Sequence, residues 1–510
     1  MATESLSPAN VPHRALLTVC AMAATLMQAL DSTIANVALP YMQGSLAASY
    51  DEVTWVLTSY IVAAAIMTAP VGWLSARFSE KRVFITSLVG FTVTSMLCGL
   101  ATSLDEMVLF RFAQGMFGAA LVPISQSVML NIYPPERRGS AMAIWGMGVM
   151  IGPILGPTLG GWLTELYDWR YVFFVNLPFG VAATLGVMFA MPAMKAKSSL
   201  RFDWFGFAAL AIGLAGLQLM LDRGSILDWF SSREIIIEAV LAVFGLYVFI
   251  VHLSTAERPF VPPRVFADRN FSMALVVMFL VAMVLLATSA LLAPWLQKLG
   301  DYPVETAGLL MAPRGLGTMA AMLVAGRLAS RMDARWVMAV GTGFLIWSFH
   351  RMTGWTPAVS QTQIVMVSVV QGFGLGFVFI PLNVVAFATL PDALRTQGTA
   401  VWSLIRNVGS AVGISIFQAM INNSLQAEHA ALAPFSSPLN RALPQALAPD
   451  TAQGAALLGG MIERQAQIIA YNNDFWLMML IAVPILFLLP LMRRPRSPTA
   501  GHGGGAAAME

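Results

Sequence analysis

The sequence predicts an all-α polytopic membrane protein with fourteen membrane-spanning helices, arranged as two six-helix bundles plus an inserted two-helix hairpin. Hydrophobic residues make up 57% of the 510 residues and charged residues only 11%, with a mean hydropathy of +0.72. Soluble domains carry roughly a quarter charged residues. Fourteen apolar runs can each cross about 30 Å of hydrocarbon, and the two halves of the chain repeat weakly. The outer surface must face lipid, which excludes a soluble enzyme.

Each predicted span is a run of about 20 mostly apolar residues. The runs are 15–39, 53–75, 82–101, 106–130, 140–165, 171–191, 204–221, 234–253, 271–296, 306–329, 336–353, 360–388, 400–421 and 474–492. The first run is too long and too polar for a signal peptide, so we expect it to remain as a span.

These spans divide the chain into five parts. They are an N-terminal tail (1–14), a six-helix bundle (15–191), a linker with the inserted hairpin (192–253), a second six-helix bundle (254–492) and a disordered tail (493–510). The second bundle includes a long outer segment, 422–473, whose two apolar stretches predict a partly helical hairpin.

The basic residues predict the orientation. Nineteen of the 29 Lys and Arg lie in the tails and in one alternating set of connectors, and seven lie in the other set. By the positive-inside rule, both termini are expected in the cytoplasm. The remaining three, Arg111, Arg314 and Arg406, fall inside predicted spans. A net charge of +3 gives no reason to expect a nucleic-acid partner.

The repeat is visible in short motifs. The segment 72–77 matches 326–331 at an offset of 254 residues, and Gln114-Gly115 matches Gln371-Gly372 at an offset of 257. Pro134 and Gly139 have counterparts in Pro391 and Gly398. Paired six-helix halves are typical of transporters, because a site between them can open to either side when the halves rock.

Asp31 is the most informative residue. A carboxylate in a membrane span is costly, so it normally faces a cavity or a partner and often carries protons. From the outer ends of their spans, Asp31 lies about 12 Å deep and Arg111 and Gln114 roughly 8 and 12 Å deep. We expect these three side chains to form one polar site. The alternative is a structural ion pair that only fixes helix packing.

Further polar residues of the spans are candidates for a substrate cavity. They are Asn36, Arg314, Gln371, Arg406 and Asn407. Arg near a helix end can instead reach the interface with its long side chain, and that alternative is stronger for Arg406 than for Arg314. With Asp31 as the one acid identified in the spans and Glu238 assigned to the interface, this balance favours anionic or neutral amphipathic substrates over dications.

Two motifs predict moving parts. The fifth span carries Gly148, Gly152, Pro153, Gly156, Pro157 and Gly160. Glycine at every fourth position leaves a bare face for close helix packing, and the prolines loosen the backbone ladder. The basic connector after the second span contains Gly72, Arg77, Lys81 and Arg82. Generic small-residue packing and positive-inside anchoring are the simpler interpretations of the two motifs; a gating role would be additional.

Enzyme chemistry finds little support. The five histidines lie in tails, in loops or near span ends without metal-binding spacing, and no lysine follows a glycine as a phosphate-binding loop requires. We therefore expect no metal, no cofactor and no ATP hydrolysis. An ion gradient remains as the energy source.

The sequence resembles the major facilitator superfamily, and more narrowly its fourteen-helix drug:proton antiporters of the EmrB/QacA type. The resemblance rests on residues 30–40, the connector 72–82, Arg111-x-x-Gln114-Gly115, the fifth span and the segment 169–178. It implies antiport for the glycine-proline span and proton transfer for Arg111 and Asp31. Ala76 and Ser79 depart from the superfamily's Asp and Gly, which weakens the usual acid-based gate. Acids that some cation-exporting relatives carry in the C-terminal half are not found, which points to the EmrB-like branch.

The resemblance also implies partners and a location. Such proteins are bacterial inner-membrane pumps that work with a periplasmic adaptor, a membrane fusion protein, and a TolC-like outer-membrane channel. Residues 422–473 could dock the adaptor, or could lie on the membrane without a partner. The expected activity is proton-driven export of amphipathic small molecules by alternating access, with an Asp31→Asn variant expected to fold but not to export. A metabolite symporter of the same fold, a polytopic membrane enzyme and a non-transporting scaffold or receptor are the alternatives.

Overall fold

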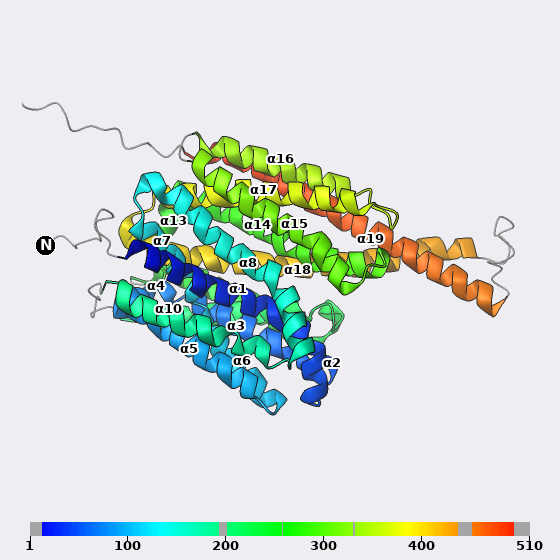
Figure 1. Ribbon diagram of the computed structural model, residues 1–510, viewed down its shortest axis with the longest axis horizontal. Coiled ribbons are helices and arrows are strands. Elements are labelled where there is room, and N and C mark those ends of the chain that lie inside the picture. The colour runs from blue at the N-terminus through cyan, green and yellow to red at the C-terminus, as the bar shows by residue number, and fades with distance from the viewer. Residues whose placement is uncertain (1–12, 193–200, 258, 330–331, 437–450, 494–510) are drawn as a thin grey trace, which may run out of the picture.

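The computed structural model describes residues 13–192, 201–257, 259–329, 332–436 and 451–493, and in these ranges every regular element is a helix (Figure 1). The predicted all-α class is confirmed. Among the described residues, eleven helices are long and apolar enough to cross a membrane, or twelve if a bent pair is counted as one span. The predicted number of fourteen is therefore not fully confirmed.

The N-terminal bundle contains ten helices, because several predicted spans are broken. They are α1 (Arg14–Ser45), α2 (Tyr50–Val53), α3 (Trp55–Thr68), α4 (Val71–Phe78), α5 (Glu80–Leu100), α6 (Leu104–Gly118), α7 (Leu121–Ile132), α8 (Arg138–Leu166), α9 (Tyr171–Phe174) and α10 (Asn176–Ala190). The second predicted span bends by 56° between α3 and α4. Pro70 lies at this break, where it removes a backbone donor from the helical ladder.

The inserted hairpin and the C-terminal bundle follow. Their helices are α11 (Trp204–Arg223), α12 (Arg233–Thr255), α13 (Arg264–Ala267), α14 (Arg269–Pro294), α15 (Val304–Leu328), α16 (Ala334–Met352), α17 (Gln361–Ala388), α18 (Arg395–Leu432) and α19 (Ala452–Leu488). A π-helical turn, Trp295–Leu299, extends α14. Helices α8 and α16 occupy the predicted spans 140–165 and 336–353.

The two bundles repeat the same packing. Helix α3 packs on α6 as α15 packs on α17, and α1 packs on α8 as α14 packs on α18. A Cβ added to Gly115 would collide with the Tyr60 carbonyl, and one added to Gly372 with the Arg314 carbonyl. These glycines belong to the repeated Gln-Gly pairs, so the weak sequence repeat corresponds to a repeat of helix contacts.

Both described ends of the chain lie at one end of the bundles, here called the terminal side (Figure 1). The Asn270 side chain, near the start of α14, bonds both the backbone N–H and the carbonyl of Arg493, and Arg335 donates to the Met492 carbonyl at 3.1 Å. At the other end, the opposite side, α18 and α19 run past the rest of the molecule. Residues 422–436 and 451–473 of the predicted outer segment are mainly continuations of these two helices; 437–450 lie outside the described residues.

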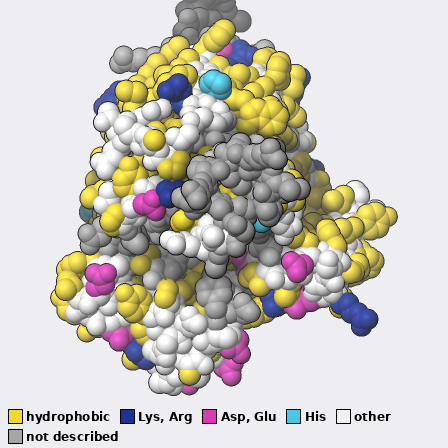
Figure 2. All heavy atoms as spheres, turned by 90° about the vertical axis from the view of Figure 1, so that its right-hand side faces the viewer, with side chains coloured by type: hydrophobic (Ala, Val, Ile, Leu, Met, Phe, Trp, Pro, Cys, Tyr) yellow, Lys and Arg dark blue, Asp and Glu magenta, His cyan; other side chains and the backbone are white. Residues whose placement is uncertain are grey.

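The exterior of the inserted hairpin is apolar. Helix α12 exposes Val240, Val243, Phe244, Tyr247 and Ile250, each by 60% or more. Figure 2 looks onto the opposite side, where acidic and basic side chains lie among polar groups while apolar side chains follow the periphery. This distribution suits a helix bundle surrounded by lipid.

Candidate functional site

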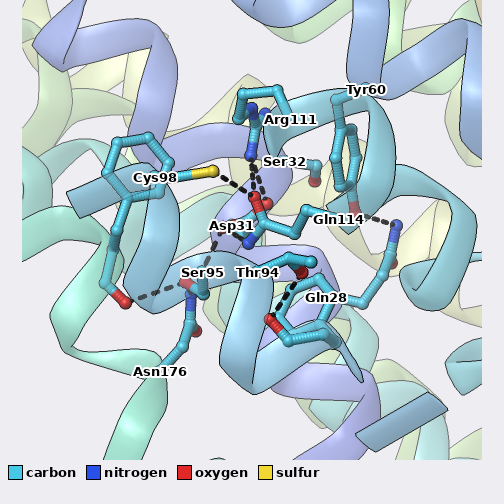
Figure 3. Close-up of polar contacts among 12 residues, drawn as sticks. Gln28, Asp31, Ser32, Tyr60, Thr94, Ser95, Cys98, Arg111, Gln114 and Asn176 are labelled. Atoms are coloured by element: carbon cyan, nitrogen blue, oxygen red, sulfur yellow. Dashed lines mark hydrogen bonds and ion pairs between the residues drawn. The ribbon is translucent and has the colours of Figure 1, made fainter. Parts of the chain in front are cut away.

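Asp31 of α1 lies at the centre of a buried polar cluster between α1, α6 and α10 (Figure 3). Its Oδ2 atom accepts a hydrogen bond of 2.7 Å from Nη1 of Arg111, and its Oδ1 atom accepts from Nε2 of Gln114 at 2.9 Å. A third donor, Nδ2 of Asn176, lies 3.2 Å from Oδ1. Asp31 and Gln114 are 0% exposed and Arg111 and Asn176 1%, so the whole cluster is closed to solvent.

Helix geometry explains the arrangement of the two α6 residues. Arg111 and Gln114 are three positions apart, so they lie on one face of α6 and reach the same partner. Nη1 of Arg111 also donates to Oε1 of Gln114 at 2.8 Å, and its Nε donates to the Val56 carbonyl at 3.1 Å. The guanidinium carbon lies 4.3 Å from the centre of the Tyr60 ring, an additional attraction for a buried cation.

Asn176 is a cluster member that the sequence interpretation did not select. It lies in the segment 169–178 that supported the family resemblance, but nothing in the sequence indicated its partner. Its Nδ2 atom also donates to Ser95 at 3.0 Å, and Ser95 donates to the Phe173 carbonyl at 2.9 Å. The cluster therefore joins four helices and holds Asp31 as a paired carboxylate.

The glycine face of α8 lies against α1 beside this cluster. A Cβ on Gly152 would lie 2.5 Å from the carbonyl carbon of Ala29, and one on Gly160 would lie 2.9 Å from Cγ1 of Ile34. At Gly156 an added Cβ would collide with the Thr33 hydroxyl, while at Gly148 the nearest atom, the Met22 carbonyl, is 3.5 Å away. The contact is therefore closest from Gly152 to Gly160. The side chains of Pro153 and Pro157 lie outside the described residues.

The basic connector contacts the C-terminal bundle through residues other than its cations. A Cβ on Gly72 would lie 2.8 Å from Cα of Gln397 in α18. Lys81 instead donates to the Met188 carbonyl within its own bundle at 2.8 Å. Arg82 is exposed and Arg77 partly exposed. Among the hydrogen bonds and ion pairs of the described residues, none joins Arg77, Lys81 or Arg82 to the other bundle, and a gating role for these cations stays a prediction.

Glu80, at the start of α5, is the acid of this connector that reaches the other bundle. It is 4% exposed, and its Oε1 atom accepts from the Thr396 hydroxyl of α18 at 3.5 Å. Ser127 of α7 lies 3.0 Å from the same Thr396 hydroxyl. Ser79, which precedes Glu80, has a φ of 79°, a conformation that favours glycine. Ala76 occupies the position that is Asp in the superfamily pattern. Glu80 nevertheless supplies an acid where the two bundles meet.

Further side chains join the halves near Glu80. Gln126 of α7 donates to Oδ1 of Asn383 at 2.6 Å, and Arg395 donates to Oδ1 of Asn131 at 3.4 Å. Within the part of the chain that the structure describes, the side-chain hydrogen bonds between the bundles all come from these few residues of α5 and α7. The bundles are thus joined toward the terminal side.

The predicted cavity residues are not brought together as one lining. Arg314 donates to Ser289 of α14. Among the described residues, the buried Nη1 atoms of Arg314 and Arg406 have no hydrogen-bond partner, and neither does either end of the amide of Gln371, which is 2% exposed. Asn36 is exposed and donates to the Ser32 carbonyl at 3.5 Å, and Asn407 is partly exposed.

A cavity of about 560 Å³ lies elsewhere, on the opposite side, between α2, α3, α6 and α11. Trp55, Val62 and Phe112 are among its apolar lining residues, and Glu52 also lines it. Hydrogen bonds from the backbone N–H and hydroxyl of Ser49 lower the pKa of the Glu52 carboxyl. None of the five predicted cavity residues is among those that line it.

The view of Asp31 as the one acid within the spans was wrong. Glu80 is 4% exposed, Glu238 7% and Asp474 0%, and Asp222 bonds the Thr58 hydroxyl from the inserted hairpin. Glu238 was assigned to the interface, and Asp474, the first residue of the predicted run 474–492, was not considered. The error has one cause: each acid lies near the end of a span, where hydropathy cannot tell a buried position from an interfacial one.

Comparison with known proteins places the chain in a family. The model described as Major Facilitator Superfamily matches residues 21–414. The multidrug export protein EmrB of Escherichia coli is 34% identical over 99% of this chain and all of its own length. The fatty acid resistance protein FarB of Neisseria gonorrhoeae is 31% identical over 94% of this chain and 96% of its own.

Solved structures agree on the fold. The human organic anion transporter MFSD10 has a TM-score of 0.60 at 14% identity, covering 92% of this chain and 100% of its own. The proton:xylose symporter XylE has a TM-score of 0.59 at 13% identity, covering 92% and 95%. The protein is therefore a multi-pass membrane transporter rather than an enzyme, and it belongs to the Major Facilitator Superfamily, in its EmrB-like branch.

Proposed function

We propose that this protein exports amphipathic small molecules from the cytoplasm of a bacterium in exchange for protons, by alternating access. The observation that carries the proposal is the buried pair of Asp31 and Arg111 between α1 and α6. Relatives that share the whole length of the chain are named for multidrug export and for fatty acid resistance, which supports an amphipathic substrate.

The pair can couple protons to movement because its stability depends on charge. While Asp31 is ionised, Arg111, Gln114 and Asn176 hold it, and α1, α6 and α10 are tied together. A proton on Asp31 removes the attraction for Arg111 and leaves a buried cation without a counter-charge, which is strongly unfavourable. Protonation would therefore loosen α1 and α6 and favour the other conformation of the N-terminal bundle.

In this cycle, the glycine face of α8 would be the surface on which α8 moves against α1. The contact of Glu80 with Thr396 would help to hold the two bundles together when the terminal side is closed. In the structure the bundles are joined toward the terminal side, so this conformation is closed there. The positive-inside distribution supports a cytoplasmic terminal side in the inner membrane. In the proposed cycle Asp31 takes a proton from the periplasmic side as substrate leaves, the bundles rock, and the proton is released to the cytoplasm.

The extensions of α18 and α19 would meet a periplasmic adaptor that leads to a TolC-like outer-membrane channel. Leu457 and Met461, on the α19 extension, are 50% and 57% exposed, beyond the part of α19 that packs in the bundle. Changing both to Ser should lower resistance in cells while leaving export in proteoliposomes intact. Loss of export in both systems would show that these residues serve the pump itself.

The test of export is a substrate panel in a host that lacks its own pumps. The panel would include oleate, ethidium and a dicationic dye, each with and without an uncoupler. We expect resistance to oleate that the uncoupler abolishes. Net proton-dependent uptake would instead identify a symporter, and the absence of any transport by purified protein in liposomes would contradict the proposal.

A further inference from the structure

We propose that Asp474 of α19 is a second proton-binding group, located in the C-terminal bundle at the position that Asn176 occupies in the N-terminal bundle. The inference deepens the proposed proton-driven export and depends on it for the use made of the proton. It rests on the repeat of helix contacts and on the surroundings of the Asp474 carboxyl group.

The repeat relates the two positions. Fourteen residues separate Asn176 from the end of α10 at Ala190, and fourteen separate Asp474 from the end of α19 at Leu488. Helix α10 packs on α1 and α5, and α19 packs on α14 and α16 in the same way. Asp474 and Asn176 thus lie at the same depth on corresponding helices.

The cation of the Asp31 cluster has no counterpart at the matching position of the C-terminal bundle. At the offset of 257 residues that relates Gln114 to Gln371, Arg111 of the same helical segment corresponds to Ser368. The Thr288 hydroxyl lies 3.4 Å from Sδ of Met478, one turn of α19 after Asp474. The fourth helix of the C-terminal half therefore has a serine where the N-terminal half has its buried arginine.

The surroundings of the two acids differ in a decisive way. Asp31 accepts three hydrogen bonds, one of them from a guanidinium. Asp474 is equally buried, at 0% exposure, but neither of its oxygens has a hydrogen-bond partner among the described residues. An ionised carboxylate that is buried without a partner costs several kcal/mol. In this conformation Asp474 is therefore protonated, whereas Asp31 is ionised.

No cation near this end of the molecule is bonded to Asp474 in the described part of the chain. Lys298 after α14, and His350 and Arg351 at the end of α16, are exposed, and Arg464 of α19 is paired with Asp301 at 2.7 Å. On α18, Glu428 and His429 lie on the extension. Tyr471, three residues before Asp474 on the same helix, is the nearest titratable group along α19.

Access is expected from the opposite side. Asn472 and Asn473 are partly exposed and adjoin Asp474 in sequence, and Arg464, ten residues earlier on the same helix, is 49% exposed. A proton from this side would reach Asp474 within about two to three turns of the water boundary. In the exchange, Asp474 would hold that proton while the terminal side is closed and release it when the bundles rock.

Infrared difference spectroscopy tests the proposal on the full chain in lipid bilayers, because the C=O stretch of a protonated carboxylic acid is separate from that of a carboxylate. We expect one component of the carboxylic-acid absorption to be lost in Asp474→Asn, kept in Asp301→Asn, and reduced when the buffer is made alkaline. Glu80 and Glu238 are also buried, so their own contributions would remain in both variants. Asn already occupies the corresponding position in the other bundle, so Asp474→Asn should pack well. Asp474→Glu should restore a band at a shifted frequency.

Ethidium-loaded proteoliposomes give the second readout: Asp474→Asn should move fewer protons per exported ethidium. A carboxylic-acid absorption that Asp474→Asn leaves unchanged, or an Asp474 component that never responds to buffer pH, would overturn the proposal. Its loss together with unchanged proton coupling would do the same, since the acid would then be only structural. A wild-type chain that shows the band but exports nothing would contradict the proposed function and leave the protonation of Asp474 established.

Discussion

Gly139 of α8 and Gly326 of α15 bring the backbones of the two bundles into direct contact at the terminal side. A Cβ on Gly139 would lie 2.5 Å from the Gly326 carbonyl oxygen, and one on Gly326 would lie 2.7 Å from the Gly139 carbonyl oxygen. Such distances leave no room for a side chain. The pair of Gly72 and Gln397 makes the corresponding contact between α4 and α18. The two contacts are related by the repeat, because each joins the second helix of one half to the fifth helix of the other.

A larger side chain at this contact should hold the terminal side open. Overpacking a closely packed contact costs about 1 to 3 kcal/mol, so Gly326→Val should disfavour the closed conformation by roughly tenfold or more. Maleimide labelling of a Gln397→Cys reporter should then be faster. Cys20 and Cys98 are buried and should add little background. Gly343→Val is the control, because an added Cβ there meets nothing within 4 Å. Equal labelling in both variants would refute the role of the contact.

Removing the charge of Asp31 should abolish export and also weaken the fold. The sequence alone suggested that Asp31→Asn would leave folding intact, but the structure leaves Arg111 buried and uncompensated in that variant, at an expected cost of about 3 to 5 kcal/mol. The double variant Asp31→Asn with Arg111→Gln should recover much of that stability and still fail to export. Thermal unfolding in detergent and ethidium efflux separate the two effects. Proton-coupled export by the double variant would reject Asp31 as the coupling acid.

We expect Glu80 to stabilise the closed terminal side through its contact with Thr396 of α18. Glu80→Ala removes the acceptor for the Thr396 hydroxyl, and we expect a larger population of the conformation that is open at the terminal side. Spin labels on α4 and on the start of α18 would report this as longer distances in pulsed electron paramagnetic resonance. Glu80→Gln keeps an acceptor and should have a smaller effect. Unchanged distances in Glu80→Ala would show that the terminal side stays closed without the Glu80 contact.

Helix α8 should be sensitive to a larger side chain at Gly156 and tolerant of one at Gly161, five residues later. A Cβ on Gly156 collides with the Thr33 hydroxyl, while one on Gly161 meets nothing within 4 Å. Gly156→Val should therefore destabilise the α1 contact by about 1 to 3 kcal/mol, and Gly161→Val should be close to wild type. Thermal unfolding of both purified variants measures the difference. Equal stabilities would mean that α8 does not need a bare face.

Much of this protein could be predicted from its sequence. Run length and hydropathy predicted the helices, because about 20 apolar residues are needed to span a bilayer. Matching depths along two helices predicted that Asp31 would meet Arg111 and Gln114, since helical rise is nearly constant. The spacing of Gly148, Gly152, Gly156 and Gly160 predicted a close contact on one face of the fifth span.

Only the tertiary structure decided which faces of the helices meet. It decided that Asn176 completes the Asp31 cluster and that Glu80 reaches Thr396 across 316 residues. It also decided that Asp474 is buried without a hydrogen-bond partner among the residues that the structure describes. The physical reason is that hydropathy reports the length and depth of a helix but not its rotation about its own axis. Rotation is determined by the fit of side chains between neighbouring helices, so the same acid near the end of a span can face water, lipid or the interior of a bundle.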